Sequence, residues 1–291
     1  MTMKFYSTQV VQMGDVDRGN VQLWNWNNTA VSGYNLIENL NFGKVNALIR
    51  GDWTNYTLCV PKVKGKALLS WSWGGKVFYD YTYMNSIQRI DLQKVPWNGS
   101  CGGGAFRGCR DLRYVVNINN SCNNLSEAFS GCVNFNFNVQ LPPSLIYTTN
   151  MFYNCFNFNQ ELKFHARTTS FYQTFYNCTS LNRNIQFTSG GDLHQTFRNC
   201  ISLNQSIQIP KGTKNMWGTF ENCYALATRI NVLSTEVTNA VNTFYGTSKA
   251  KQVYIYYKYA NGVNTNTYNI AVSNWSGKNG VTLCNLGRAP W

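Results

Sequence analysis

Apolar and polar positions in the middle of the chain repeat every 22 to 24 residues. A Phe lies three residues before a Cys in six successive segments, AFRGC, AFSGC, MFYNC, TFYNC, TFRNC and TFENC, and a seventh segment, TFYGT, keeps the Phe without the Cys. The seven positions are Phe106, Phe129, Phe152, Phe175, Phe197, Phe220 and Phe244. A period of this length predicts a solenoid, in which each coil buries its apolar side chains against the neighbouring coils.

The remaining positions of the repeat predict the elements of one coil. Two apolar residues follow each Cys by seven and nine positions with one residue between them, an alternation typical of a short strand. We expect these strands to stack side by side, parallel, in one sheet. Their centres are Asn117, Gln140, Lys163, Gln186, Gln208 and Asn231. An apolar or aromatic residue four positions before most of the Phe residues predicts a short helical or 3₁₀ segment.

The flanking segments carry no copy of the repeat. Residues 1–100 contain short aromatic and β-branched segments separated by Gly and Asn, which predict a β-rich N-terminal domain. Residues 249–291 predict two or three strands joined by a turn at Asn261-Gly262. End coils of a solenoid need shielding from water and from edge pairing. We therefore expect both flanks to cap the repeat of residues 101–248, with docking to a partner as the alternative.

The repeat resembles the BspA-type leucine-rich repeat, whose coils read approximately A-F-x-x-C-x-x-L-x-x-I-x-I-P. CISLNQSIQIP, residues 200–210, matches this pattern most fully, and the resemblance covers residues 101–248. The chain departs from this pattern by having Thr before most Phe residues and Asn after the Leu position. Its FNQ motif also resembles a repeat found in Mycoplasma-type surface proteins. The resemblance implies a leucine-rich-repeat-like solenoid used for adhesion or recognition, as in bacterial surface proteins and bacteriophage structural proteins, and implies no enzyme.

The repeated cysteines are about 23 residues apart, with no C-x-x-C pair, so they form a row and not a metal-binding cluster. We expect buried thiols, because Cys packs as a small hydrophobe. The row is Cys109, Cys132, Cys155, Cys178, Cys200 and Cys223; a disulfide among Cys59, Cys101, Cys122 and Cys284 is left open. Asn residues recur in register one position after the conserved Leu or Phe and predict a ladder of side-chain amides. They are Asn136, Asn159, Asn182 and Asn204.

Composition and net charge restrict the classes of partner that we expect for this chain. The net charge is +13, and residues 249–291 contain no acidic residue, which favours an anionic partner. There is no Lys/Arg-rich run and no aromatic-basic RNA-binding motif, so nucleic acid is not expected. The sequence contains no run of eighteen apolar residues, so we expect no membrane insertion. The N-terminus lacks an apolar segment of signal-peptide length, and we expect no export by the ordinary secretion route.

No group of residues predicts catalysis, a cofactor or a metal site. His194 occupies a position that is Ser, Thr, Tyr or Trp in other coils, which is more typical of an exposed face than of a catalytic base. Glycan cleavage would need two carboxylates across a groove, and the acids of the repeat are scattered.

Two rows of side chains are the candidate binding residues. The strand centres Gln140, Lys163, Gln186 and Gln208 must point away from the core, and amides can bind uncharged sugars without the desolvation cost of charges. Tyr172, His194 and Trp217 form a second row near the Phe unit, suited to stacking on a sugar or a protein.

These observations lead us to expect a non-catalytic structural or binding protein. The leading hypothesis is a bacteriophage virion component, in the tail or another exposed part, that recognises a host glycan or a partner subunit, with other virion proteins or a second copy as further partners. The alternatives are a bacterial cell-surface adhesin of the BspA type and a glycan-cleaving tail enzyme.

Overall fold

The computed structural model describes four short N-terminal strands and most residues beyond Gly102. The described residues are 10–13, 21–24, 57–59, 89–91, 103–110, 112–116, 118, 120–257 and 266–288. They fall into two compact units, Met1–Ser144 and Leu145–Trp291. The expected domain boundaries at 100/101 and 248/249 stay predictions. The strand centre Asn117 and the turn at Asn261-Gly262 lie outside the described residues.

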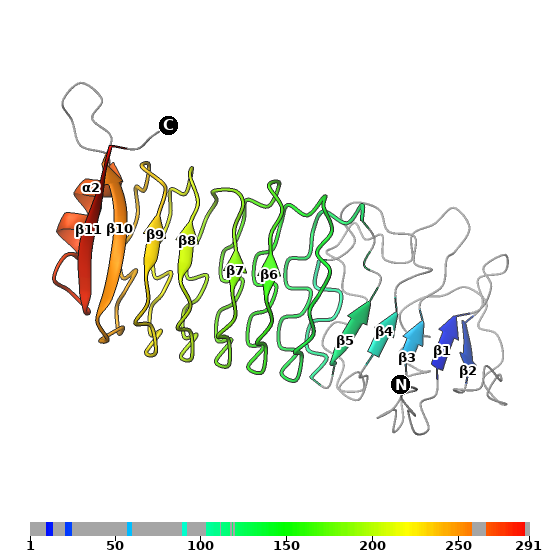
Figure 1. Ribbon diagram of the computed structural model, residues 1–291. Helices are drawn as coiled ribbons and strands as arrows, with labels where there is room; N and C mark the ends of the chain where they lie inside the picture. Colours follow the sequence, from blue (N-terminus) through cyan, green and yellow to red (C-terminus); the bar gives the residue numbers. More distant parts are fainter. Residues whose placement is uncertain are drawn as a thin grey trace, which may run out of the picture. The chain divides into compact units, whose positions relative to one another are not determined.

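One short strand per coil lies on the same side of the second unit (Figure 1). The strands are β6 (Leu162–Lys163), β7 (Ile185–Gln186), β8 (Ile207–Ile209) and β9 (Ile230–Val232). β6 pairs with β7 and β8 with β9, both parallel, with Lys163 opposite Gln186 and Gln208 opposite Asn231. Flanking apolar residues are buried, whereas Lys163, Gln186 and Gln208 are exposed. The predicted parallel strands are confirmed at these four centres. The prediction of a single continuous sheet is wrong, because β7 and β8 belong to different sheets.

The Phe side of each coil is a run of tight turns and not the predicted helix. In all seven coils the residues two before and two after the Phe have positive φ, as at Asn150 (55°) and Asn154 (60°) around Phe152. A left-handed residue at every fourth position interrupts a right-handed helix. The backbone bonds the next coil instead: Phe152 N donates to Thr174 O at 2.8 Å. We call this side of the second unit the turn ribbon; it comprises residues 148–155, 171–178, 193–200, 216–223 and 240–247.

The repeated Phe side chains form one stacked column in the second unit. Successive ring centroids are 5.5–5.6 Å apart and the rings are within 8° of parallel. The column is Phe152, Phe175, Phe197, Phe220 and Phe244, none more than 2% exposed. Aromatic residues from the strand side meet it, since Phe164 lies 6.1 Å from Phe175 and Phe187 lies 5.9 Å from Phe197. The core therefore lies between the strands and the turn ribbon.

The repeat cysteines are buried, as predicted. All six are fully buried, and Cys178, Cys200 and Cys223 each donate an Sγ hydrogen bond of 3.0–3.1 Å to the carbonyl of the Phe one coil earlier. Burial raises the pKa of the Cys178 thiol well above its usual range, and the neighbouring Cys200 and Cys155 raise that pKa further. Burial likewise raises the pKa of Cys109 to about 12. The thiols of Cys178, Cys200 and Cys223, whose pKa burial raises, are therefore in the protonated form that donates.

Two ladders of asparagine side chains link the coils. In the predicted ladder, the Oδ1 atoms of Asn159, Asn182 and Asn204 accept the backbone N–H of the next coil at 2.8–2.9 Å. A second ladder runs along the turn ribbon at the position before each Cys. There Asn177 Nδ2 donates to Asn154 Oδ1 at 2.7 Å, and Asn199 and Asn222 continue the series. The sequence analysis did not predict the second ladder.

The Thr residues that replace Ala before the Phe residues also have a structural role. Each is buried, and its hydroxyl donates to a carbonyl of the preceding coil at 2.8–2.9 Å. They are Thr174, Thr196, Thr219 and Thr243. A buried hydroxyl needs such a partner, and the repeat supplies it at each step.

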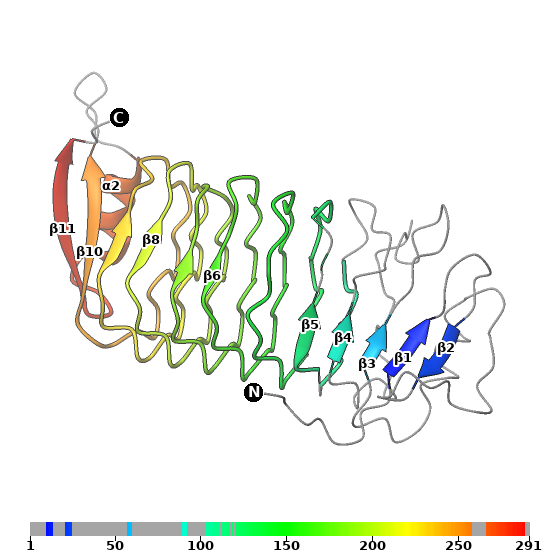
Figure 2. The ribbon, with the colours of Figure 1, turned by 45° about the vertical axis from the view of Figure 1, so that its right-hand side comes forward.

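The C-terminal segment extends the sheet of the second unit in a way that the sequence analysis did not predict. β10 (Lys251–Tyr257) pairs in parallel with β9, and β11 (Val281–Arg288) pairs in parallel with β10. Between them lie the helical segments α2 (Asn266–Ile270) and η2 (Ala271–Trp275), which contact one face of β10 and β11 (Figure 2). Residues 249–291 thus contain two strands, within the predicted two or three, but residues 266–275 between them are helical. The ring of Trp275 lies edge-on to Phe244, 5.5 Å away. A capping role stays a prediction.

The first unit has its own sheet, of order β2-β1-β3-β4-β5. Its strands are β1 (Val10–Met13), β2 (Val21–Trp24), β3 (Thr57–Cys59), β4 (Arg89–Asp91) and β5 (Tyr114–Val116). β1 and β2 are antiparallel, whereas β3, β4 and β5 follow β1 in parallel. Parallel pairing thus begins upstream of residue 101, where we expected no coil.

Gln140 is exposed but lies in no strand, so the predicted strand at this centre is wrong. Pro142 and Pro143 follow it by two and three residues, and neither has an N–H to donate to a ladder.

Asn177→Ala should lower the free energy of unfolding by about 2–3 kcal/mol. The change removes two side-chain amide hydrogen bonds, and it leaves an alanine at φ 60°, a left-handed conformation that alanine adopts only with strain. Asn177→Gly loses the same bonds without the backbone strain and should cost about 1 kcal/mol less. Chemical denaturation measures both, with Arg183→Ala at an exposed site as control. Equal losses for the Ala and Gly variants would contradict the strained-turn explanation.

Lys251 is 3% exposed, and its Nζ donates to the carbonyls of Thr247, Lys249 and Asn279 at 2.5–2.9 Å. Burial lowers the pKa of Lys251 to about 8, whereas nearby Cys223 acts in the opposite direction. Between this pKa and the unfolded value of about 10.4, the unfolded chain binds more protons than the folded one. The free energy of unfolding, relative to Lys251→Met, should therefore rise from pH 8 to pH 10. A difference that stays constant or falls over this range in denaturation experiments would show that the ammonium is not destabilised by burial.

Candidate functional site

The sheet of the second unit is interrupted between β7 and β8. One coil earlier the backbones are joined: Leu162 N donates to Asn184 O at 3.1 Å and Phe164 N to Gln186 O at 2.9 Å. The equivalent donors on β7 are the N–H groups of Ile185 and Phe187. Within residues 184–210, all of which are described, neither makes a backbone hydrogen bond to β8. The interruption therefore leaves two backbone donors on the edge of β7.

Pro210 accounts for one lost rung of this ladder. Alternate residues of a parallel strand bond to opposite neighbours. Ile209 bonds toward β9, since its carbonyl accepts from Leu233 N at 2.9 Å. The next residue, Pro210, therefore faces β7, and it has no N–H to donate.

The coil between β7 and β8 is also one residue short. Its Phe residues, Phe175 and Phe197, are 22 apart, against 23 for the coils on either side. The missing residue falls in the loop 187–193, which has seven residues where loops 164–171 and 209–216 have eight. Gly190 and Gly191 lie there, and a Cβ on either would collide with the carbonyl of Lys211 or Thr169. Only glycine lets the shortened loop pass between its neighbours.

The same two coils stay joined along the turn ribbon. Phe175 N donates to Thr196 O and Asn177 N to Arg198 O, both at 2.9 Å. The interruption of backbone pairing between these two coils is therefore confined to the strand side.

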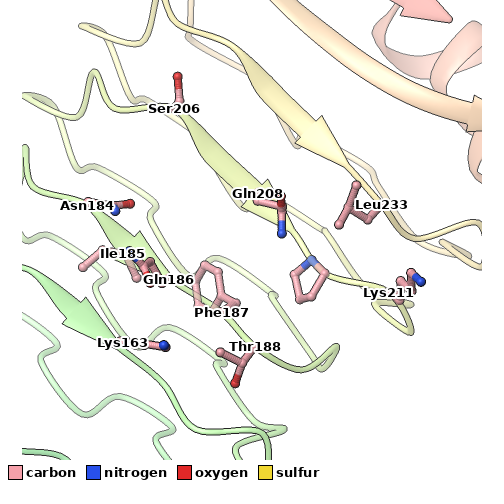
Figure 3. Close-up of a pocket in the computed structure, with 11 residues that line it drawn as sticks. Lys163, Asn184, Ile185, Gln186, Phe187, Thr188, Ser206, Gln208, Lys211 and Leu233 are labelled. Atoms are coloured by element: carbon pink, nitrogen blue, oxygen red, sulfur yellow. The ribbon is translucent and has the colours of Figure 1, made fainter. Parts of the chain in front are cut away.

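A hollow of about 640 Å³ lies over this interruption (Figure 3). Its polar lining residues come from the coils that contain β6, β7 and β8. Its apolar lining residues lie in β7 or directly after β7, β8 and β9. The lining residues are Lys163, Asn184, Ile185, Gln186, Phe187, Thr188, Ser206, Gln208, Pro210, Lys211 and Leu233. We call this hollow the strand groove. It combines amides, hydroxyls, two ammonium groups and an apolar floor.

Three of the predicted row, Lys163, Gln186 and Gln208, come together in the strand groove. Gln140 belongs to the first unit and lies outside it. The sequence analysis missed Thr188, Ser206 and Lys211 as lining residues. The short coil and Pro210 were the signals in the sequence that could have located the groove.

Tyr172, His194 and Trp217 form a continuous column, as the shared register predicted. Ring centroids are 4.7 Å apart between Tyr172 and His194 and 4.4 Å apart between His194 and Trp217. Backbone bonds hold the register, for example Gln173 N to His194 O at 2.9 Å. Burial lowers the pKa of His194, as does Arg198, whereas Asp192 raises it. The imidazole is therefore predominantly neutral at pH 7.

The aromatic column and the strand groove lie on opposite sides of the core. Phe164, beside Lys163 on β6, points inward and meets Phe175 of the turn ribbon. Since inward side chains from the strands and the ribbon meet in the core, their outward neighbours face away from each other. The two predicted rows therefore cannot form one binding site.

Among the described residues, no three His, Cys, Asp or Glu side chains are grouped to hold a metal ion. In the same part of the chain, no helix has the length and apolar character needed to span a membrane.

No protein-family model matches the chain, and no curated protein matches it. Among solved structures, it is similar to a leucine-rich repeat protein from Bacteroides ovatus ATCC 8483, with 17% sequence identity and a TM-score of 0.40. The match covers 71% of this chain and 64% of that one. The parallel repeat is established by this chain's own strand register and turn ribbon, and membership of the BspA-type family stays a prediction.

The amide protons of Ile185 and Phe187 should exchange with solvent faster than those of Leu162 and Phe164. The first pair faces the interruption, whereas the second pair donates to the next coil. Hydrogen exchange followed by NMR measures all four in one sample. Equal protection of the two pairs would show that the ladder between β7 and β8 is closed in solution.

Proposed function

We propose that this chain is a non-catalytic glycan-binding protein and that the strand groove is its binding site. The observation that carries the proposal is the interruption between β7 and β8, which places open backbone donors beneath Gln186 and Gln208. Among the described strands of the second unit, β6 to β11, the only successive pair that does not share a sheet is β7 and β8.

The chemistry of the groove suits a sugar. Side-chain amides and backbone N–H groups can donate to hydroxyls, and Ile185, Pro210 and Leu233 offer an apolar surface for the carbon face of a ring. Ligand sites commonly combine apolar lining with a few placed polar groups. Neutral amides also bind hydroxyls with a smaller desolvation cost than charged groups.

Binding without cleavage is the better proposal of the two glycan hypotheses. Hydrolysis of a glycosidic bond requires a pair of carboxyl groups flanking the bond. None of the eleven residues that line the strand groove is Asp or Glu.

The aromatic column supports a second candidate function, contact with a partner subunit. Tyr172, His194 and Trp217 are half-buried, and their rings contact one another at tilts of 38° and 42°. Aromatic side chains are enriched in protein interfaces. A virion component or a bacterial surface adhesin would each need both a glycan site and an attachment face. Of these two, we favour a virion component. A portal or tail gene next to the gene for this chain would support that choice.

The double variant Gln186→Ala/Gln208→Ala should weaken binding to a recognised glycan on a polysaccharide array about tenfold or more, since each lost amide contributes about 1 kcal/mol. Its free energy of unfolding should change by no more than about 0.5 kcal/mol per exposed site.

Gln140→Ala, the same change on the first unit, is the matched control and should leave binding unchanged. Binding that survives the double variant but is lost in Trp217→Ala would place the glycan site on the aromatic column and contradict the proposal.

A further inference from the structure

We propose that the ligand of the strand groove is an acidic polysaccharide that runs across the strands from Lys163 to Lys211. This inference rests on the proposed function and adds the charge and direction of the ligand.

The charge of the groove is one-sided. Lys163 and Lys211 are its two charged lining residues, and both are exposed. Glu161 directly precedes β6 but does not line the groove, and Lys163 makes no ion pair among the described residues. Two ammonium groups facing a hollow without a carboxylate favour an anionic ligand.

The rest of the second unit strengthens this preference. Residues 145–291 contain twelve Lys and Arg and four Asp and Glu, a net charge of +8. Two of the four acids are engaged on the turn ribbon: Glu221 pairs with Arg198 at 3.1 Å, and Asp192 accepts from the His194 N–H at 2.9 Å. The second unit therefore has a positive net charge, which favours an anionic ligand.

The positions of the lysines set the direction of the ligand. Lys163 ends β6 and Lys211 follows β8, so β7 with Gln186 lies between them, and Figure 3 shows the two lysines on opposite sides of the hollow. A ligand that contacts both must cross the amides of Gln186 and Gln208. A chain of sugars with repeated carboxylates or phosphates meets this requirement, since its hydroxyls face the amides and its charges face the lysines.

The test is an array of bacterial polysaccharides in which each uronic-acid polymer stands beside its carboxyl-reduced form, with phosphate-bearing teichoic acids on the same array. The wild-type protein should bind an acidic polymer at least about tenfold more tightly than its reduced form, and less tightly as salt increases. Binding to uronate or to teichoic polymers identifies the source of the charge.

Lys163→Gln and Lys211→Gln should each weaken binding to the acidic polymer roughly fivefold, and weaken binding to the reduced form by a smaller factor. Lys214→Gln, in the same loop as Lys211 but outside the groove, is the matched control and should retain wild-type binding. If Lys214→Gln weakens binding as much as Lys211→Gln, the preference comes from net charge and the inference is wrong.

Two further outcomes separate the inference from the proposed function. Equal binding of acidic and reduced polymers, lost in the Gln186→Ala/Gln208→Ala variant, overturns the acidic ligand and leaves the glycan site. Binding unaffected by the amide variant, or no binding to any polymer, overturns both.

Discussion

Hydrogen bonding between neighbouring coils is the constraint on which the second unit depends. A coil satisfies only part of its own backbone, because a left-handed residue at every fourth position of the turn ribbon prevents a continuous helix. Some N–H groups, such as that of Tyr153, bond within their coil, and the others must find a carbonyl one coil away, as Phe152 finds Thr174. This fixes the spacing of the coils, and the 5.5 Å stack of Phe rings, the thiol row and the asparagine ladders all follow from that spacing.

The strand groove is a local exception to this rule. A proline on the side facing β7 and a coil one residue short remove the rungs between β7 and β8, while the turn ribbon keeps the two coils in register. The backbone donors of Ile185 and Phe187 then face a hollow lined by amides and two lysines. A repeat protein can thus create a polar site without any insertion, through one proline and one omitted residue.

Much of the repeat could be predicted from the sequence, because its buried positions are strictly periodic. The Phe column, the thiols and the outward strand centres follow from one register. The turn ribbon could not, since apolar residues four apart are compatible with both a helix and a run of turns. The Asn or Gly two residues after each Phe carries the deciding signal, a left-handed φ, but composition alone does not reveal it. The helical segment 266–275 could not be predicted, because its aromatic and β-branched residues are typical of a strand, whereas Trp275 packs edge-on against Phe244.

A crystal structure of the protein with an oligosaccharide fragment of a polymer that it binds is the most direct measurement of the central claim. The account predicts the fragment over the interruption between β7 and β8, with hydroxyls within hydrogen-bonding distance of Gln186, Gln208 and the backbone N–H of Phe187. A fragment on the turn ribbon beside Trp217, with the groove filled only by solvent, would contradict it.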